Sequence, residues 1–224
     1  KDTFKAKNKY HNHTDSSMMR IPFYTNSGAQ CSQVAMKSVL EYFGKAYSLA
    51  QLDQATGRRD PFYTWTTQNV AALFNLGMEV KAFSTDKLEP YLDGEDYIRE
   101  RFGPDADAIL SVTDMEPFLW SIQSCIANGL YEYRNLSLEE IQDHLNAGHI
   151  PIVTVDWNKL YERDGPFDGH TIVITGFDTD HVYYHESGPK FAHPNRPVSR
   201  SKFSIAAGIG TDNQETVIVF GVST

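Results

Sequence analysis

The stretch TNSGAQCSQVAMKSVLEYFG, residues 25–44, joins a loop of turn-forming residues to an amphipathic helix. Apolar residues recur along it at helical spacing and form one stripe: Ala35, Met36, Val39, Leu40 and Phe43. Gly44 follows the stripe as a typical C-terminal stop. Cys31 opens the predicted helix, so its thiol lies at the positive end of the helix dipole, beside unpaired backbone N–H groups.

The thiol of Cys31 is therefore a candidate nucleophile. The helix dipole and the free N–H groups favour thiolate over thiol, and the thiolate is the reactive form. The alternative is a small buried apolar residue, the usual role of a cysteine. Cys125, in an apolar stretch, is interpreted as a packing thiol. A Cys31–Cys125 bridge is a less favoured alternative, and two cysteines cannot form a disulfide framework.

Outside this helix, the sequence favours helices in its first part and strands in its last part. Further helices are predicted over residues 49–55, 67–76, 117–133, 138–147 and 201–207, and strands over 78–83, 150–155, 171–177, 182–184 and 216–222. Thr67 is the expected cap of its helix, and the turn at 178–180 joins residues 170–186 into a hairpin. This order predicts an α+β fold, with one domain over residues 21–224 after an arm of residues 1–20.

Composition and charge narrow the class of protein. The 224 residues are 41% hydrophobic and rich in aromatic side chains, which is enough for a sizeable core and excludes a disordered chain. No apolar run approaches the roughly 20 residues of a membrane helix, so no membrane span is predicted. The net charge of −9 disfavours a nucleic-acid partner. Residues 1–20 are polar and net basic and lack the apolar stretch of a signal peptide, which leaves a cytoplasmic location and export with processing both open.

His170 stands at the mouth of a strongly β-forming run, GHTIVITG, residues 169–176. A strand end is a rigid platform, from which an imidazole can face a helix N-terminus packed on the same sheet. Glu186 lies on the neighbouring strand, and its carboxylate is predicted to accept the imidazole N–H and fix the tautomer. Asp178 in the turn and Asp168 in the preceding loop are weaker candidates for this role, and the alternative for His170 is a surface histidine at a loop edge.

These blocks resemble a known family. Residues 21–26 (IPFYTN) and 31–44 are similar to the nucleophile region of papain-like bacterial cysteine peptidases, in particular the bacteriocin-processing, double-glycine leader peptidases and their stand-alone relatives (cysteine peptidase family 39). Residues 169–178 and 182–186 match the family's His strand and acid strand in order and spacing. The resemblance covers residues 21–189. It implies a papain-like fold, in which the nucleophile helix of an N-terminal helical lobe packs on a C-terminal antiparallel sheet.

The resemblance also implies a soluble hydrolase that cleaves a peptide or amide bond through a thioester, with Cys31, His170 and Glu186 as its triad. The family's oxyanion-hole Gln is replaced by Asn26, with Gln30 as the second choice for that role. Ser32 stands where the family has Gly, and Glu186-Ser187 where it has Asp-Pro. These departures keep two alternatives open: a papain-like acyl- or peptidyl-transferase, of which phytochelatin synthase is an example, and a degenerate, non-catalytic binding domain.

Two groups of histidines raise the alternative of a metal-dependent enzyme. One lies in the arm and the other near the acid strand: His11, His13 and Asp15, and His181, His185 and His193. Neither spacing is distinctive for zinc. The group in the arm is interpreted as solvated, and no metal or other cofactor is predicted. Sequence motifs for nucleotide binding and serine-esterase chemistry are absent. The expected partner is a peptide or amide substrate, whose identity the sequence leaves open together with the oligomeric state.

Overall fold

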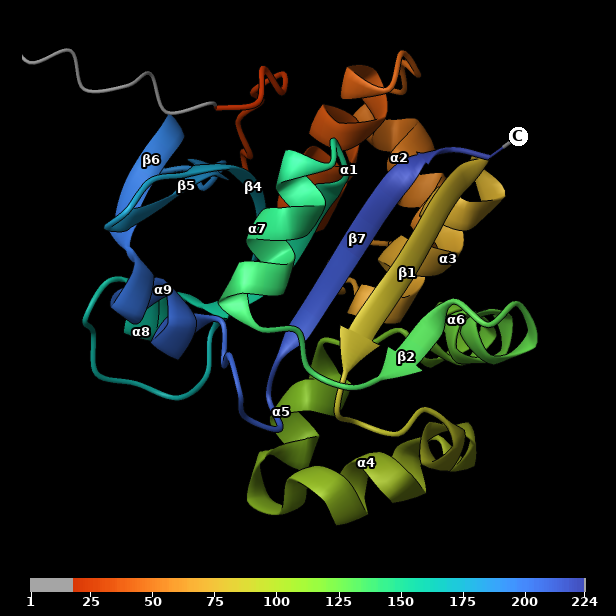
Figure 1. Cartoon of the computed structure of the whole chain (residues 1–224). Helices are drawn as coiled ribbons and strands as arrows, with labels where there is room; N and C mark the ends of the chain where they lie inside the picture. Colours follow the sequence, from red (N-terminus) through yellow and green to blue (C-terminus); the bar gives the residue numbers. More distant parts are fainter. Residues whose placement is uncertain (1–17, 224) are drawn as a thin grey trace, which may run out of the picture.

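A seven-stranded sheet forms the centre of residues 18–223, the part of the chain that the computed structural model describes (Figure 1). The strand order is β2-β1-β7-β3-β4-β5-β6. All neighbouring pairs are antiparallel except β1 with β2, which is parallel. The strands are β1 (Met78–Ser84), β2 (Tyr131–Tyr133), β3 (Ile150–Asp156), β4 (Gly169–Phe177), β5 (His181–Glu186), β6 (His193–Ser199) and β7 (Glu215–Val222).

Helices cover both faces of this sheet. Figure 1 shows α1 (Cys31–Tyr42), α2 (Leu49–Thr56) and α3 (Thr66–Asn75) behind it and α7 (Leu138–Asn146) in front. Helix α6 (Met115–Ala127) packs on α3, and the short α8 (Trp157–Leu160) packs on α9 (Arg200–Ala206). The segment between β1 and α6 holds α4 (Glu95–Phe102), α5 (Ala106–Ser111) and the 3-10 turns η1 (Glu89–Asp93) and η2 (Gly103–Asp105). The α+β class predicted from the sequence is confirmed.

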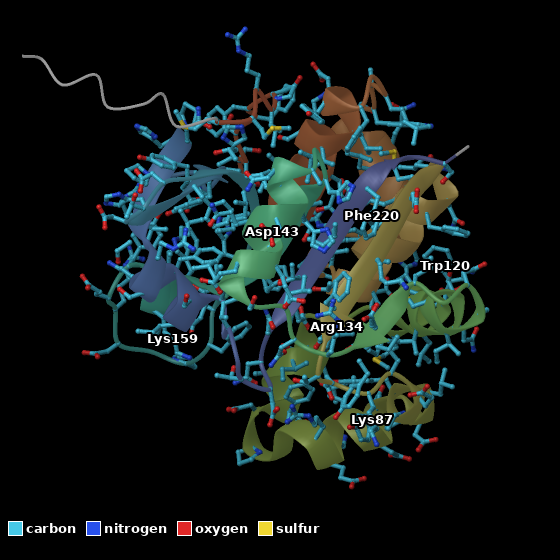
Figure 2. All side chains as sticks on the ribbon, in the orientation of Figure 1. Lys87, Trp120, Arg134, Asp143, Lys159 and Phe220 are labelled. Carbon is cyan, nitrogen blue, oxygen red and sulfur yellow. The ribbon has the colours of Figure 1, made fainter. Side chains whose placement is uncertain are left out.

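The main core lies between the sheet and α1 to α3. Met36, Val39 and Leu40 of the predicted stripe are fully buried there. A smaller apolar cluster lies under α7 on the other face, around Phe83. Figure 2 shows two side chains of this face, Phe220 and Arg134, whose guanidinium lies 5.1 Å from the ring centre of Phe83. Burial of one face of α1 on the sheet therefore fixes where the N-terminus of this helix lies.

The prediction of one helix over residues 117–133 is wrong. Helix α6 ends at Ala127, and Gly129 follows with a φ of 60°, a left-handed conformation that glycine adopts without strain. The chain then turns back as β2, whose residues pair with β1. The alternation in Tyr-Glu-Tyr is too short to compete with the helical pattern before it when only the sequence is considered.

Two further features depart from the prediction. Strand β6 is absent from the strands predicted from the sequence. It contains Pro194 and Pro197, and it lies at the sheet edge, where missing N–H donors are tolerated. Helix α3 begins one residue earlier than predicted, with Trp65 rather than Thr67 in the capping position. The side chain of Gln68 accepts the Trp65 N–H at 2.9 Å, so Thr67 is not needed as a cap.

Most of the predicted N-terminal arm lies outside the described residues, and so do His11, His13 and Asp15. Close to the predicted end of the arm, the N–H of Met19 donates to the carbonyl of Thr175 in β4 at 2.7 Å. Across residues 18–223, no helix combines the length and the apolar character that a membrane crossing requires.

Candidate active site

Cys31 lies where the start of α1 meets the start of β4. The hydroxyl groups of Ser32 and Thr171 are 3.0 Å apart and join the two elements next to the thiol. The loop before α1 is tied to the end of β5, because the N–H of Asn26 donates to the carbonyl of Ser187 at 2.7 Å. Cys31 is a half-buried residue with a free thiol. The helix N-terminus, the His strand and the acid strand thus converge at one end of the sheet.

His170 and Glu186 are hydrogen-bonded directly, with 2.8 Å between Nε2 and Oε1. The strand register explains the contact: β4 and β5 pair Val173 with His185, so Glu186 lies beside Ile172, on the same face as His170. His170 is 4% exposed and Glu186 is fully buried. Because Glu186 occupies Nε2, the Nδ1 atom of the ring is the nitrogen left for Cys31.

The carboxylate of Glu186 accepts two more hydrogen bonds. The N–H of Gly188 donates to Oε1 at 2.7 Å, and the hydroxyl of Tyr161 donates to Oε2 at 2.8 Å. Burial raises the pKa of Glu186, but the hydrogen bond and charge of His170 and the other two donors outweigh burial, so the pKa lies below its ordinary value. Glu186 is therefore held ionised, with a donor at each oxygen.

The electrostatics of the site favour an ion pair between Cys31 and His170. Burial raises the pKa of the Cys31 thiol, but its interactions with His170, and to a lesser extent Thr171, outweigh burial and lower it below the ordinary value. Burial lowers the pKa of His170, whereas Cys31 and Glu186 raise it, in total to about 10. Between the pKa values of this pair, the thiol is a thiolate and the ring is an imidazolium, which is the reactive state of a cysteine nucleophile.

Two side chains from the turn after β3, neither of them predicted from the sequence, lie against His170 and Glu186. Trp157 stacks on His170, with ring centres 4.7 Å apart and planes inclined by 17°. Tyr161, four residues later, contacts Glu186. The side chain of Asp156 caps this turn by accepting the N–H of Asn158 at 3.0 Å. The Asp-Trp-Asn sequence after an apolar strand is the one local signal that predicts such a cap.

The two amides considered for an oxyanion hole lie in different surroundings. Asn26 is 5% exposed, and its Oδ1 accepts the N–H of Gly28 at 2.9 Å and the N–H of Gln30 at 3.2 Å. These two donors fix the orientation of the amide group. The side chain of Gln30 instead donates to Asp53 of α2 at 2.7 Å. Among the hydrogen bonds of the described residues, the Asn26 amide group thus serves as an acceptor, whereas the Gln30 amide group serves as a donor to Asp53.

The other acidic candidates and the second cysteine lie elsewhere. Asp178 accepts the hydroxyl of Tyr183 at 2.6 Å in the β4–β5 turn, at the opposite end of β4 from His170. Asp168 is exposed, and its carbonyl accepts the N–H of Trp157 at 2.7 Å. Cys31 and Cys125 are both free thiols. Cys125 is fully buried, and burial raises its pKa to about 12, so it is a neutral thiol at ordinary pH.

The histidines near the acid strand do not converge. His185 is buried and bonded at both ring nitrogens, to the carbonyl of Ile21 at 2.9 Å and to the N–H of Asn195 at 3.2 Å. His181 contacts Asp178 in the turn at 3.3 Å. Across residues 18–223, His, Cys, Asp and Glu side chains form no group of three or more that would fit a metal ion.

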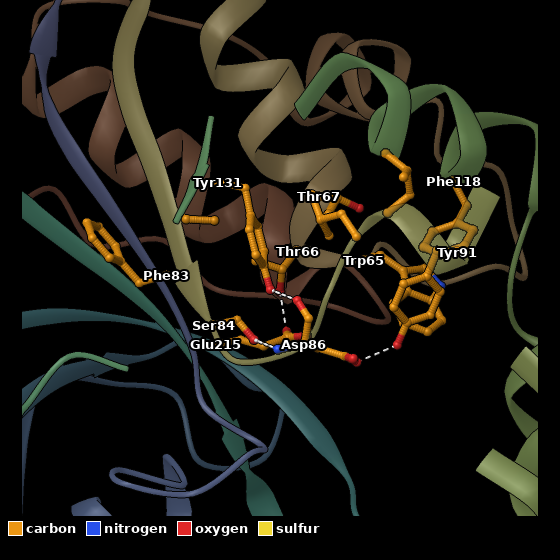
Figure 3. Close-up of a pocket in the computed structure, with 13 residues that line it drawn as sticks. Trp65, Thr66, Thr67, Phe83, Ser84, Asp86, Tyr91, Phe118, Tyr131 and Glu215 are labelled. Carbon is orange, nitrogen blue, oxygen red and sulfur yellow. Dashed lines mark hydrogen bonds between the residues drawn. The ribbon is translucent and has the colours of Figure 1, made fainter. Parts of the chain in front are cut away.

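A second carboxyl group, that of the half-buried Glu215, lines a cavity of about 30 Å³ beside the start of α3 (Figure 3). Glu215 opens β7 and accepts the hydroxyl of Thr66. Asp86 lies nearby, with its carboxylate bonded to the hydroxyl of Tyr91 at 2.5 Å and its carbonyl bonded to the hydroxyl of Tyr131. Desolvation raises the pKa of Glu215, which has the hydroxyl donors Thr66 and Thr154 and, within residues 18–223, no ion pair with a cation. None of the three candidate triad residues lines this cavity.

Comparisons with known proteins agree with this arrangement. The model of the Peptidase_C39 like family matches residues 7–206. A protein described as a C39-like peptidase from Bacillus anthracis has a similar solved structure, with 12% identity, a TM-score of 0.56 and coverage of 94% of this chain and 100% of that one. The solved structure of the peptidase domain of Streptococcus ComA is also similar. It has 14% identity and a TM-score of 0.48, and the match covers 89% of this chain and 97% of that one. The likeness to the Bacillus anthracis protein concerns the fold alone. No curated protein matches the chain.

Proposed function

Because the chain belongs to the Peptidase_C39 like family, whose members are cysteine peptidases of papain-like fold, we propose that it cleaves a peptide or amide bond through a thioester on Cys31. The observation that carries this proposal is the continuous arrangement of Cys31, His170 and Glu186. A thiol of lowered pKa faces an imidazole of raised pKa, and a buried carboxylate holds that imidazole at 2.8 Å.

The reaction begins with attack of the Cys31 thiolate on the carbonyl carbon of the substrate. A carbon–sulfur bond forms, and the π electrons of the carbonyl move to its oxygen. The imidazolium of His170 then gives its Nδ1 proton to the leaving nitrogen as the carbon–nitrogen bond breaks, which leaves a thioester. Neutral His170 next takes a proton from water, the resulting hydroxide attacks the thioester, and the acid product leaves as the thiolate and the imidazolium form again.

Asn26 is the proposed donor to the developing oxyanion. Its Oδ1 is held by two backbone N–H groups, so the NH₂ group keeps one orientation before the substrate arrives. The backbone N–H of Cys31 is the proposed second donor, because it lies in the first turn of α1, where N–H groups lack a helical partner. Donors that are fixed in advance stabilise the transition state without reorganisation, and one such donor contributes about 3 kcal/mol.

The experiment that tests this proposal is covalent labelling with a peptide aldehyde or acyloxymethyl ketone, followed by intact mass measurement. The unchanged protein is expected to gain one label, and Cys31→Ala is expected to gain none. Cys125→Ala is the matched control, because that thiol is buried and neutral and its removal leaves labelling intact. Undiminished labelling of Cys31→Ala would refute the assignment of the nucleophile.

Hydrolysis and transfer differ in the acceptor that resolves the thioester. Incubation of the protein with a peptide mixture, with and without an added amine, separates them by the mass of the products. The proposed hydrolase gives free carboxyl termini in both mixtures, whereas an acyl- or peptidyl-transferase gives amide products when the amine is present. A non-catalytic binding domain gives neither product.

A further inference from the structure

Tyr161 lies directly behind the candidate triad and contacts its acidic member. We propose that Tyr161 is a positioning residue, whose hydroxyl keeps the Glu186 carboxylate ionised and aligned with His170. This inference rests on the proposed function, because it assigns Tyr161 a part in supporting the same nucleophile. Tyr161 acts through Glu186 and does not itself contact the reacting atoms.

The hydrogen bonds of Glu186 divide between its two oxygens. Oε1 accepts Nε2 of His170 at 2.8 Å and the N–H of Gly188 at 2.7 Å, whereas Oε2 accepts the hydroxyl of Tyr161 at 2.8 Å. Because Glu186 is fully buried, bulk water does not stand in for a lost donor. Donors at both oxygens fix the plane of the carboxylate, and Tyr161 is the donor to Oε2.

The ring of Tyr161 is itself held in place by its neighbours. Tyr161 directly follows α8, four residues after Trp157, so a single helical turn contacts both His170 and Glu186. The ring of Phe191 stacks on that of Tyr161, with centres 5.2 Å apart and planes inclined by 25°. The guanidinium of Arg196 on β6 lies 5.0 Å from the Tyr161 ring centre. The hydroxyl therefore has a fixed direction toward Glu186.

The charges around Glu186 explain why this hydroxyl matters to the pair. Among the described residues, the titratable or charged groups that face the carboxylate or its donors are His170 on β4, Tyr161 and Arg163 after α8, Tyr184 on β5 and Arg196 on β6. His170 is the one cation in direct contact with the carboxylate among the described residues. Removal of the Tyr161 hydroxyl is expected to raise the pKa of Glu186. As the pH falls, Glu186 is then protonated earlier than in the unchanged protein, and the imidazolium of His170 loses its counter-charge at that higher pH. The thiolate then gives way to the neutral thiol at higher pH as well.

The test is the pH dependence of Cys31 alkylation by iodoacetamide, followed by mass spectrometry, in the unchanged protein and in Tyr161→Phe. The phenylalanine ring keeps the contact with Phe191 and removes only the hydroxyl. The acid limb of the alkylation rate is expected to move up by about half a pH unit to one unit, with the rate at neutral pH changed by less than about threefold. Phe191→Leu loosens the ring but keeps the hydroxyl, and it is expected to give a smaller shift in the same direction.

Two further proteins make the test specific. Tyr183→Phe is the matched control, since it removes a hydroxyl that donates to Asp178 at 2.6 Å on the same sheet, away from the pair. It is expected to leave the acid limb in place. In a Glu186→Gln background, Tyr161→Phe is expected to add no shift, because the carboxylate through which the hydroxyl acts is gone.

The outcomes separate this inference from the proposed function. If the unchanged protein shows a lowered acid limb but Tyr161→Phe superimposes on it, or is slowed equally at every pH, the positioning role is overturned and the nucleophile stands. A shift that persists in the Glu186→Gln background also overturns it. If the unchanged protein alkylates at Cys31 with the pH dependence of an ordinary thiol, the ion pair is absent and both proposals fall.

Discussion

Replacement of Glu186 by Gln tests the part of the site that sets the charge of His170. The side chain keeps its shape and can keep an oxygen acceptor toward Nε2, so the change removes the negative charge rather than the contact. A hydrogen bond to a charged group contributes about 1.5–3 kcal/mol, against about 0.5–1.5 for a neutral one. The difference of about 1–2 kcal/mol corresponds to a fall of about one unit in the pKa of His170, since one unit equals about 1.4 kcal/mol. Loss of the direct charge attraction adds to this fall.

The assay is an NMR titration of the His170 ring in a Cys31→Ala background, where the thiolate no longer contributes to its pKa. Glu186→Gln in that background is expected to lower the pKa of His170 by one to two units, which weakens the ion pair about 10- to 100-fold in the complete site. Asp178→Asn is the matched control, because that carboxylate contacts another histidine, His181, at 3.3 Å. An unchanged pKa of His170 in Glu186→Gln would show that the charge of Glu186 does not stabilise the imidazolium.

Two other predictions concern the side-chain amide of Asn26 and the carboxyl group of Glu215. Asn26→Asp keeps an acceptor for the N–H groups of Gly28 and Gln30, but it replaces the NH₂ donor by a carboxylate oxygen that repels an oxyanion. The value of kcat is therefore expected to fall at least about 100-fold, and equal activity would exclude Asn26 from the oxyanion hole. The raised pKa of Glu215 means that its contribution to stability is present below the unfolded pKa, near ~4.3, and is lost as pH rises through the folded pKa. Glu215→Gln is therefore expected to raise the urea midpoint at pH ~7 but not at pH ~4, whereas the exposed Glu139→Gln changes neither. A gain of the same size at both pH values would contradict the burial argument.

The parts of the site that the sequence predicts are those with a local signal. Cys31 follows from the start of an apolar-striped helix, and His170 follows from the start of a β-branched strand. The hairpin turn brings Glu186 next to the His strand, but the register that places it on the same face as His170 follows only from the pairing of Val173 with His185. A slip of one residue would turn Glu186 to the other face of the sheet.

The features that escaped prediction depend on contacts between distant segments. Nothing near Trp157 or Tyr161 in the sequence shows that their turn lies against the His and acid strands. Strand β6 contains two prolines, which argue against a strand until its place at the sheet edge is known. Gln30 was the second choice for the oxyanion donor by its position next to Cys31, and only the fold brings Asp53 within 2.7 Å of its amide.

The proposed mechanism requires that the interaction with His170 ionises the thiol of Cys31. The most direct test is the pH titration of thiolate ultraviolet absorbance in the unchanged protein, with the absorbance of Cys31→Ala subtracted to remove Cys125 and the tyrosines. One thiolate is expected to form with a midpoint below ~8.5, the ordinary value for a cysteine. A midpoint at or above ~8.5 would contradict it.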